Sequence, residues 1–340
     1  MFQSDVEKGG DSRSLKEKLQ THYKGGPSQN NFNKYFFRVL FQVQACTQIV
    51  MTLNYLTPFL FSDFDPMFRY YLKVFFMYLF LMGQANWLCA ICYSNALPDY
   101  RDRPEPEGTW YEKPEDCFDY ICKTQAPYKD KNGLEWKYCK QCSRYKPPRS
   151  HHCKVCDTCI LRRDHHCFLI GSCVGHYNQR YFIAFLFYGS AVMVLGLVLN
   201  IRYMSFQPEA EAWYDYVFPV SVWRLVFGSS AMTWHFCLIT MNVFLMSIFG
   251  PMCAIYITGQ MMLVTSGYTL YEVAKKVEVK VTTSYSENLR LVFGDYWLTS
   301  FIFPSQILFM QRNDGTTFEG VVFNQGFGID PNRRKKLNVE

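Results

Sequence analysis

The sequence has little charge for its length. Asp, Glu, Lys and Arg make up 19% of its 340 residues, against ~25% in soluble domains, while hydrophobic residues reach 49%. Low charge without a short repeat excludes intrinsic disorder, a collagen helix and a long coiled coil. The 14 cysteines are too dilute for a small disulfide-bonded scaffold. A mean hydropathy of -0.10 is too low for a chain that is all membrane, so a few spans should alternate with polar segments.

Four long runs of the sequence lack Asp, Glu, Lys and Arg. They cover residues 39–62, 74–98, 181–201 and 225–271. A helix that crosses the ~30 Å hydrocarbon core needs about 20 apolar residues, so each of the first three runs predicts one span. The fourth run is long enough for one span or for two.

The basic residues decide the number of spans. Of the 35 Lys and Arg residues, seven precede the first run, 15 lie between Arg101 and Arg180, and nine follow Tyr271. The positive-inside rule places these three segments in the cytoplasm, which requires an even number of crossings. We therefore predict an α-helical polytopic membrane protein with four transmembrane helices, the fourth at about residues 235–264. Pro251 is expected to kink this helix.

This topology divides the chain into five parts. They are a cytoplasmic N-terminal segment (1–38), helices 1 and 2 (39–98), a cytoplasmic loop (99–180), helices 3 and 4 with a luminal loop (181–264), and a cytoplasmic tail (265–340). Both termini are then cytoplasmic. The first 30 residues are polar and show no signal-peptide core, so the first helix is expected to direct membrane insertion.

The central loop concentrates thiols and imidazoles. Seven cysteines follow the spacing Cys-x2-Cys-x9-His-Cys-x2-Cys-x2-Cys-x4-Asp-His-His-Cys-x5-Cys, from Cys139 to Cys173, and five histidines lie between His151 and His176. Paired Cys-x2-Cys turns suit tetrahedral zinc, and thiol clusters in the cytoplasm usually indicate metal binding or catalysis. Two closed sites need eight ligands. Seven cysteines with one histidine would supply them, as would six cysteines with two histidines and one free thiol, and spacing alone leaves both open.

The tetrad Asp164-His165-His166-Cys167 within this framework resembles the cysteine-rich domain of the DHHC family of membrane protein S-acyltransferases, or palmitoyltransferases. The similarity extends over about residues 137–182. It includes the run Lys-Pro-Pro-Arg-Ser-His-His-Cys at 146–153, followed by Cys173-Val174-Gly175, Asn178 and Phe182. The family topology also places this domain between the second and third of four spans.

The resemblance implies a role for each residue of the framework. Zinc ligands of the first site would be Cys139, Cys142, His152 and Cys159, and those of the second Cys153, Cys156, His166 and Cys173. Cys167 would be the nucleophile, His165 its general base, and Asp164 the residue that orients His165. The implied partners are palmitoyl-CoA as co-substrate, cytoplasmic or membrane proteins with membrane-proximal cysteines, and the lipid bilayer. Nucleic acid is not expected, and the implied location is the endoplasmic reticulum or Golgi, with the plasma membrane left open.

The chemistry agrees with the residue types. A thiol with a pKa of ~8.5 is mostly protonated at neutral pH, and an adjacent imidazole can accept its proton. A carboxylate on the other ring nitrogen fixes the imidazole tautomer. The expected reaction is a ping-pong transfer in which Cys167 takes the acyl group from acyl-CoA and passes it to a substrate cysteine.

Two departures from the family pattern leave an alternative open. Phe168-Leu169 stands where family members commonly have Pro-Trp. Leu270 stands in place of the second threonine of a Thr-Thr-x-Glu motif that runs here from Thr269 to Glu272. The alternative function is a catalytically inactive, zinc-binding membrane adaptor.

Other residues also have expected roles, in binding the acyl donor and in attaching the tail. Small residues of the third span, such as Gly189 and Gly196, would make room for an acyl chain or serve helix packing. Asn288 would bridge the tail to the catalytic region, as the resemblance implies. Four basic side chains would attract CoA phosphates or anionic lipid headgroups. These side chains are Lys146, Arg149, Arg162 and Arg163.

Overall fold

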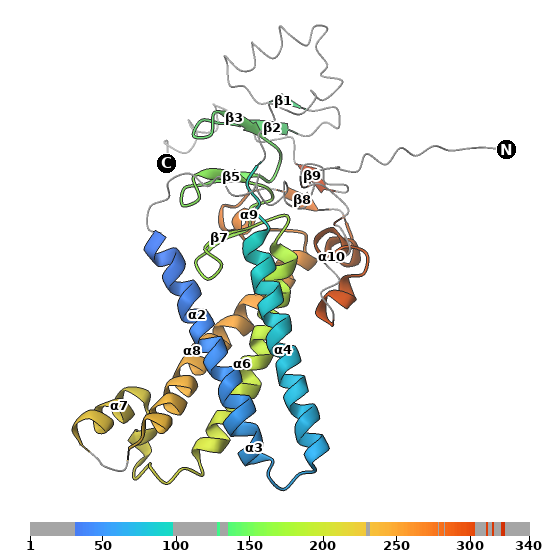
Figure 1. The fold of residues 1–340 in the computed structure, drawn as a ribbon. Coiled ribbons are helices and arrows are strands. Elements are labelled where there is room, and N and C mark those ends of the chain that lie inside the picture. Colours follow the sequence, from blue (N-terminus) through green and yellow to red (C-terminus); the bar gives the residue numbers. More distant parts are fainter. Residues whose placement is uncertain are drawn as a thin grey trace, which may run out of the picture.

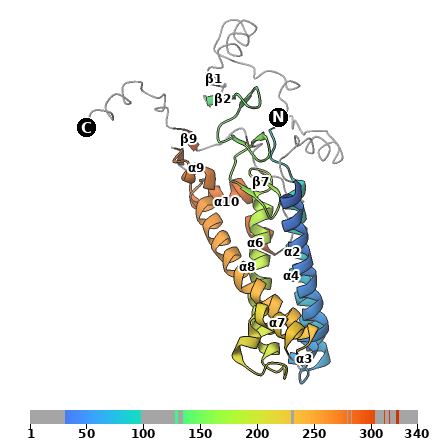
Figure 2. The same ribbon diagram turned by 90° about the vertical axis from the view of Figure 1, so that its left-hand side faces the viewer.

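The computed structural model describes residues 31–97, 135–228, 232–277 and 283–302, together with 128–129, 279–281, 311, 315 and 321–323. Most of the predicted N-terminal segment, the first part of the central loop and the end of the tail lie outside these residues. Four described helices are long and apolar enough to cross a membrane. They run side by side, and the cysteine-rich segment covers one end of them (Figures 1 and 2). The predicted fold class is confirmed, with the cysteine clusters between the second and third of these helices.

The first span, Tyr35–Leu60, changes its winding near its end. It consists of α2 (Asn31–Met51), a π-helical turn η1 (Thr52–Leu56) and α3 (Thr57–Leu60). Pro58 has no N–H to donate to the preceding turn, and the wider π turn directly before it accommodates this loss.

The second span, α4 (Pro66–Cys92), begins earlier than the charge-free run suggested. The Asp65 carboxylate accepts a hydrogen bond from the Met67 N–H at 2.7 Å, and Pro66 takes the first helical position, where its missing N–H costs nothing. Arg69 and Lys73 therefore lie inside the helix. Long basic side chains near a helix end can extend to the membrane surface. A span can therefore begin before the run that lacks charged residues.

The third and fourth spans are α6 (Gln179–Met204) and α8 (Trp234–Thr265). The long apolar run at 225–271 thus forms one span, and α8 continues through Pro251. Between α6 and α8 lie a short 3-10 helix η3 (Trp213–Tyr216) and the helix α7 (Phe218–Phe227). The start of α6 is fully enclosed, because residues 180–186 pack among α4, α8 and the cysteine-rich segment.

The cysteine-rich segment consists of small antiparallel hairpins. In chain order its strands are β1 (Tyr128–Lys129), β2 (Glu135–Cys139), β3 (Arg144–Lys146), β4 (His151–Cys153), β5 (Thr158–Ile160), β6 (His165–Cys167) and β7 (Ser172–Val174). The pairs are β1 with β2, β2 with β3, β4 with β5, and β6 with β7. After α8 follow α9 (Leu270–Ala274), β8 (Val279–Val281), α10 (Tyr285–Phe293), η4 (Trp297–Phe301) and β9 (Val321–Phe323), with β8 paired to β9.

Candidate functional site

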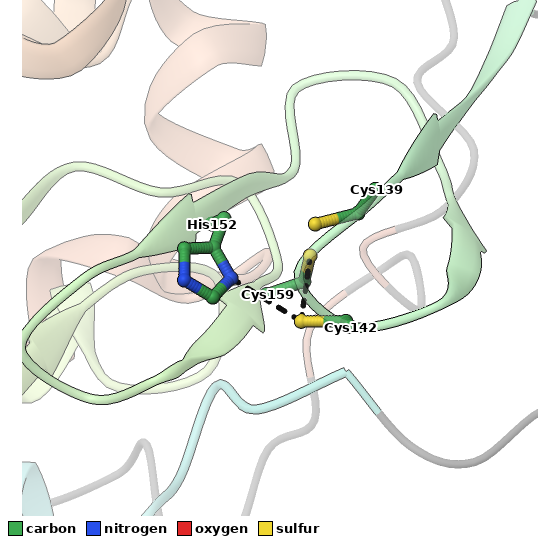
Figure 3. Close-up of side chains that lie close together, drawn as sticks. All are labelled: Cys139, Cys142, His152 and Cys159. Carbon is green, nitrogen blue, oxygen red and sulfur yellow. Dashed lines mark hydrogen bonds between the residues drawn. The ribbon is translucent and has the colours of Figure 1, made fainter.

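The first cluster of potential metal ligands joins two hairpins. Cys139 ends β2 and Cys142 follows in the turn to β3, while His152 on β4 lies opposite Cys159 on β5. Their four ligand atoms lie within 4.8 Å of one another and point toward a common centre (Figure 3). Cys142 Sγ is 3.2 Å from His152 Nδ1 and 3.6 Å from Cys159 Sγ.

The second cluster joins the next two hairpins. Cys153 from β4 and Cys156 from the turn after it meet His166 of β6 and Cys173 of β7, which face each other across their hairpin. His166 Nδ1 lies 3.3 Å from Cys156 Sγ, 3.8 Å from Cys153 Sγ and 3.7 Å from Cys173 Sγ.

Both clusters fit zinc in donor type and in size. Tetrahedral zinc with Zn–S bonds of ~2.3 Å and Zn–N bonds of ~2.0 Å sets sulfur atoms about 3.8 Å apart and sulfur and nitrogen about 3.5 Å apart. The sulfur–sulfur distances are 3.6 Å between Cys142 and Cys159 and 3.7 Å between Cys156 and Cys173. The two Cys3His clusters could therefore bind two zinc ions. Among the described residues Cys167 belongs to neither cluster.

Strand alternation directs the two histidines of the tetrad to opposite faces of β6. Side chains of successive residues in a strand point to opposite faces, so His165 and Cys167 share one face of β6 while His166 points to the other. The same alternation on β4 sends His152 to the first cluster and Cys153 to the second. The interleaved order of ligands in the sequence follows from this geometry.

The face with His165 and Cys167 is turned toward the helix bundle. Cys167 packs against a cluster of buried side chains that includes Trp87 of α4 and Phe185 of α6. The His165 ring lies 5.3 Å from the ring of Phe182, between ring centroids. The thiol therefore lies at the boundary between the cysteine-rich segment and the apolar bundle.

Asp164 is 1% exposed and holds one ring nitrogen of His165. Its carboxylate accepts hydrogen bonds from His165 Nδ1, the Leu270 backbone N–H and Gln260 Nε2, each at 2.7 Å. Burial works against the charged form, but the hydrogen bonds, that of His165 foremost, keep the pKa of Asp164 below its usual value. Asp164 is thus an ionised anchor for the imidazole.

The surroundings of His165 favour its protonated form. Burial alone would lower its pKa, but the bond to Asp164 and then the proximity of Cys167 outweigh it and raise the pKa to about 9. With Nδ1 directed to Asp164, the other nitrogen, Nε2, is available for proton exchange. Nε2 is buried, and among the described residues it has no hydrogen-bond partner.

A chain of buried amides that the sequence did not reveal leads to Asp164. Arg162 Nη1 donates to Gln179 Oε1 at 2.7 Å, Gln179 Nε2 to Gln260 Oε1 at 3.0 Å, and Gln260 Nε2 to Asp164 at 2.7 Å. All four side chains belong to residues no more than 5% exposed. A guanidinium group only donates hydrogen bonds, so the side-chain oxygen of Gln179 must face Arg162. The Gln179 Nε2 group then faces the oxygen of Gln260, and Gln260 Nε2 faces Asp164.

The modified Thr-Thr-x-Glu motif lies against the site. Thr269 and Glu272 form a reciprocal cap at the start of α9. Glu272 accepts two hydrogen bonds from buried Arg149, at 2.6 and 2.7 Å. Leu270 reaches Asp164 through its backbone N–H, which any residue except proline can supply. The missing threonine hydroxyl is therefore not needed for this contact.

Phe168, which stands where the family commonly has proline, lies at the edge of the site. It is 57% exposed, and its ring centroid lies 6.4 Å from that of Phe37 in α2 and 5.5 Å from that of His166. Arg38 Nε donates to the Ile170 carbonyl at 3.1 Å. The segment after the tetrad is thus joined to the start of the first span.

The structure corrects one expectation about the basic residues. Arg149 and Arg162 are buried and bonded to Glu272 and Gln179, so they do not offer their charge to CoA phosphates or lipid headgroups. Lys146 Nζ donates to the Ser150 carbonyl and Arg163 Nη1 to the His152 carbonyl, both at 2.6 Å. The charge of these four side chains is evident from the sequence, but the oxygen atoms that accept their hydrogen bonds within the protein are not.

Asn288 joins the tail to the end of α8. Its side-chain amide donates to the Thr265 carbonyl at 2.8 Å, and Leu289 and Phe293 of the same helix, α10, pack against Ile183 of α6. The contact is with the helix that carries Gln260, five residues before Thr265, rather than with the tetrad itself.

Residues 133–277 match the family model described as DHHC palmitoyltransferase. The match includes both ligand clusters, the tetrad and the segment from Thr269 to Glu272. The chain carries a DHHC palmitoyltransferase domain. This confirms the resemblance seen in the cysteine-rich segment.

Several proteins with similar sequences carry palmitoyltransferase names. Probable protein S-acyltransferase 16 of Arabidopsis thaliana is 37% identical over 121 residues, 33% of this chain and 42% of that protein. Palmitoyltransferase ZDHHC22 of Mus musculus is 32% identical over 171 residues, 49% of this chain and 59% of that protein. ZDHHC22 of Danio rerio is 26% identical over 270 residues, 76% of this chain and 87% of that protein. The Arabidopsis and mouse matches thus span less than two thirds of those relatives.

The zinc assignment predicts a fixed metal content. Purified protein is expected to contain two zinc ions per chain, and Cys159→Ser to contain one, because Cys159 is a ligand of the first cluster only. The variant should also unfold at a lower temperature, since structural zinc stabilises small domains strongly. Elemental analysis and thermal unfolding measure both effects. Cys237→Ser, which removes another buried cysteine outside the clusters, is the matched control and should keep two ions. One zinc ion per wild-type chain would contradict the eight-ligand assignment.

Proposed function

We propose that this chain is a protein S-acyltransferase that moves a long-chain acyl group, palmitoyl, from acyl-CoA to cysteine thiols of proteins. The observation that carries the proposal is the buried Asp164–His165 hydrogen bond of 2.7 Å, with Cys167 on the same strand face as His165. The catalytic residues are Cys167 as nucleophile and His165 as base, with Asp164 orienting His165.

The transfer runs in two balanced steps. In the first, the Cys167 thiol gives its proton to His165 Nε2, and the thiolate attacks the thioester carbonyl of acyl-CoA. The carbon–sulfur bond to CoA breaks, and the CoA thiolate leaves with the proton from His165. In the second, a substrate thiol gives its proton to His165 and attacks acyl-Cys167, and Cys167 is regenerated as a thiol.

Zinc has a structural task in this proposal. The first ion would be held by Cys139, Cys142, His152 and Cys159, and the second by Cys153, Cys156, His166 and Cys173. Bound zinc would supply tetrahedral cross-links between the hairpins. The chain's own residues do the rest, since β6 carries both His165 and Cys167 on a strand that His166 fixes from the opposite face.

The apolar bundle next to Cys167 would take the acyl chain. Cys167 and Phe41 both pack against the buried cluster that contains Phe185. Phe41 and Phe185 also line an apolar cavity of about 60 Å³ among the four spans. A methylene group occupies about as much space as a water molecule, ~30 Å³, so a palmitoyl chain would enter only as these side chains move outward. Each buried methylene contributes about 0.8 kcal/mol, which favours this movement.

Filling the cavity is expected to shorten the preferred acyl chain. Gly189 lines it, and a Cβ at Gly189 would meet nothing within 4 Å, so Gly189→Leu places its side chain in open space. We expect the ratio of lauroyl to palmitoyl transfer to rise roughly tenfold, measured with a competing mixture of acyl-CoAs. Gly259→Leu in α8 is the matched control, because its Cβ is equally free and Gly259 does not line the cavity. An unchanged ratio in Gly189→Leu would place the acyl chain elsewhere.

The proposed reaction also assigns sides and partners. The cysteine-rich domain would face the cytoplasm, where acyl-CoA is made available, together with both termini. Acceptors would be cytoplasmic or membrane proteins whose cysteines lie close to the bilayer. The endoplasmic reticulum or Golgi is the proposed location.

Autoacylation tests the proposed function directly. Zinc-loaded wild-type protein, incubated with labelled palmitoyl-CoA, is expected to take up label that hydroxylamine removes and to release one CoA for each acyl group bound. Adding a peptide with a cysteine should then transfer the label. No label in a zinc-replete, folded protein would favour the inactive adaptor. The adaptor rests on Phe168-Leu169 and on Leu270. Leu270 contacts Asp164 through its backbone N–H, so its side chain gives that alternative no support, while Leu169 packs against the same apolar cluster as Cys167.

A further inference from the structure

The connection between α6 and α8 forms a small structure of its own at the end of the bundle opposite the cysteine-rich domain. In both views α7 lies beside α8, near the level of α3 (Figures 1 and 2). Ser221 of α7 shares a hydrogen bond of 2.8 Å with Thr240 of α8, and the rings of Phe218 and Phe244 lie 5.9 Å apart. One face of α7 is therefore fixed against a membrane span.

The opposite face of α7 is apolar and uncovered. Its exposed residues are Pro219, Trp223, Val226 and Phe227, which share one side of a helix at spacings of three and four residues. Trp223 is 60% exposed and Phe227 74%. A helix of ten residues is about 15 Å long, too short to cross a ~30 Å hydrocarbon core, so this face is not part of a further span.

The charges around α7 are directed away from this apolar face. Arg224 pairs with Asp215 at 2.5 Å and with Glu211 at 2.7 Å. Asp215 is fully buried and also accepts the backbone N–H groups of Glu211 and Ala212, each at 2.9 Å. The helix thus presents apolar side chains on one face and satisfies its ionic groups on another.

Aromatic side chains extend the apolar face along the connection. Three of the seven tryptophans of the chain, Trp213, Trp223 and Trp234, lie here and are 78%, 60% and 69% exposed. Trp234 is the first residue of α8, so one of these exposed rings belongs to a span. Tryptophan and tyrosine are enriched where membrane meets water, because their rings are apolar and carry a polar group.

We infer that α7 is an in-plane membrane helix whose partner is the phospholipid leaflet remote from the cysteine-rich domain. The stripe from Pro219 to Phe227 lies at the boundary between headgroups and acyl chains, and the paired Arg224 lies on the water side. Because Ser221 and Phe218 attach α7 directly to the membrane-spanning helix α8, lipid rather than a protein partner is the occupant we assign to the stripe. The inference depends on the four spans and not on the acyltransferase activity.

Depth-dependent fluorescence quenching tests this assignment. Full-length protein is reconstituted in vesicles of phosphatidylcholine brominated either near the headgroup or near the chain end, and the spectrum of Trp223→Phe is subtracted from that of wild type. The difference reports Trp223 alone, and the retained aromatic ring preserves folding. We expect about twofold stronger quenching by bromine near the headgroup than by bromine near the chain end. Trp136→Phe is the control, because Trp136 lies on β2 in the domain away from the bundle, and its difference signal should respond to neither lipid.

The other outcomes overturn the inference. Quenching of Trp223 by aqueous iodide without quenching by brominated lipid would show a surface in water. Quenching by neither agent would show that protein, such as a second copy of the chain, covers the stripe. Stronger quenching by bromine near the chain end would place α7 inside the hydrocarbon core.

Discussion

Cys167→Ser is expected to abolish acyl-enzyme formation, with a fall in the rate of CoA release on the order of 1,000-fold or more. A hydroxyl is far less acidic than a thiol, so His165 would no longer produce a competent nucleophile. The fold should persist, because Cys167 is not a member of either ligand cluster. The measurement is single-turnover incorporation of labelled palmitate, with zinc content and thermal unfolding determined on the same samples.

Two further variants define what the result means. His165→Ala should retain the Cys167 thiol and zinc but slow acylation roughly 100- to 10,000-fold, the usual contribution of a general base. Cys253→Ser is the control, because Cys253 is a buried cysteine in the same apolar cluster that Cys167 contacts. Hydroxylamine-sensitive label that persists in Cys167→Ser would assign the acyl group to another cysteine and contradict the proposed nucleophile.

The zinc framework was the part of the site most accessible from sequence. Cys-x2-Cys spacing indicates metal because each pair shares a local turn, and the resemblance supplied the grouping of eight ligands into two sites. Spacing could not show why His166 joins a ligand cluster and His165 does not. That difference comes from the alternation of side chains along β6, a strand of only three residues.

The spans were predictable in number but less so in extent. Charge-free runs located all four helices, yet α4 starts at Pro66 and includes Arg69 and Lys73. Its start depends on the cap formed by Asp65, a local signal that the length of an uncharged run does not contain. The apolar helix α7 has ten residues, so a search for runs of about 20 apolar residues does not identify it.

The supports of Asp164 could not be found by inspecting the sequence. Gln179 is the first residue of α6, whereas Gln260 lies five residues before the end of α8, and 81 residues separate the two. Each looks like an isolated polar residue near the end of a span. Only the packing of α6 against α8 beside β6 makes them neighbours and shows that Gln260 is a positioning residue for Asp164.

Gln260→Glu is expected to slow acylation of Cys167 on the order of 100-fold, while KM for palmitoyl-CoA stays within about twofold. The substitution keeps the shape of the side chain but replaces the N–H donor, 2.7 Å from Asp164, with oxygen. Two carboxyl groups at that distance cannot both ionise, so Asp164 would share a proton with the new acid and hold His165 less firmly. Rapid-quench measurement of the first turnover separates this rate from acyl-CoA binding.

Gln179→Glu distinguishes a directional role of the amide chain from simple packing. The new carboxylate would still accept from Arg162 and would form an ion pair with it, so thermal stability should not fall. A carboxylate cannot donate to Gln260, however, and the Gln260 amide would turn its oxygen toward Asp164. We expect acylation to slow roughly tenfold. If these amides only filled space, this variant would retain the wild-type rate.

A buried amide elsewhere in α8 provides the control for both variants. Asn242 accepts a hydrogen bond of 2.8 Å from Gln44 of α2, away from the tetrad. Asn242→Asp should lower thermal stability, because it buries an unpaired acid, yet leave the acylation rate of folded, zinc-loaded protein unchanged. Wild-type rates in both Gln260→Glu and Gln179→Glu would show that His165 and the Leu270 N–H orient Asp164 without the amide chain. Loss in those two variants alone would establish that the Gln179 and Gln260 amides orient Asp164.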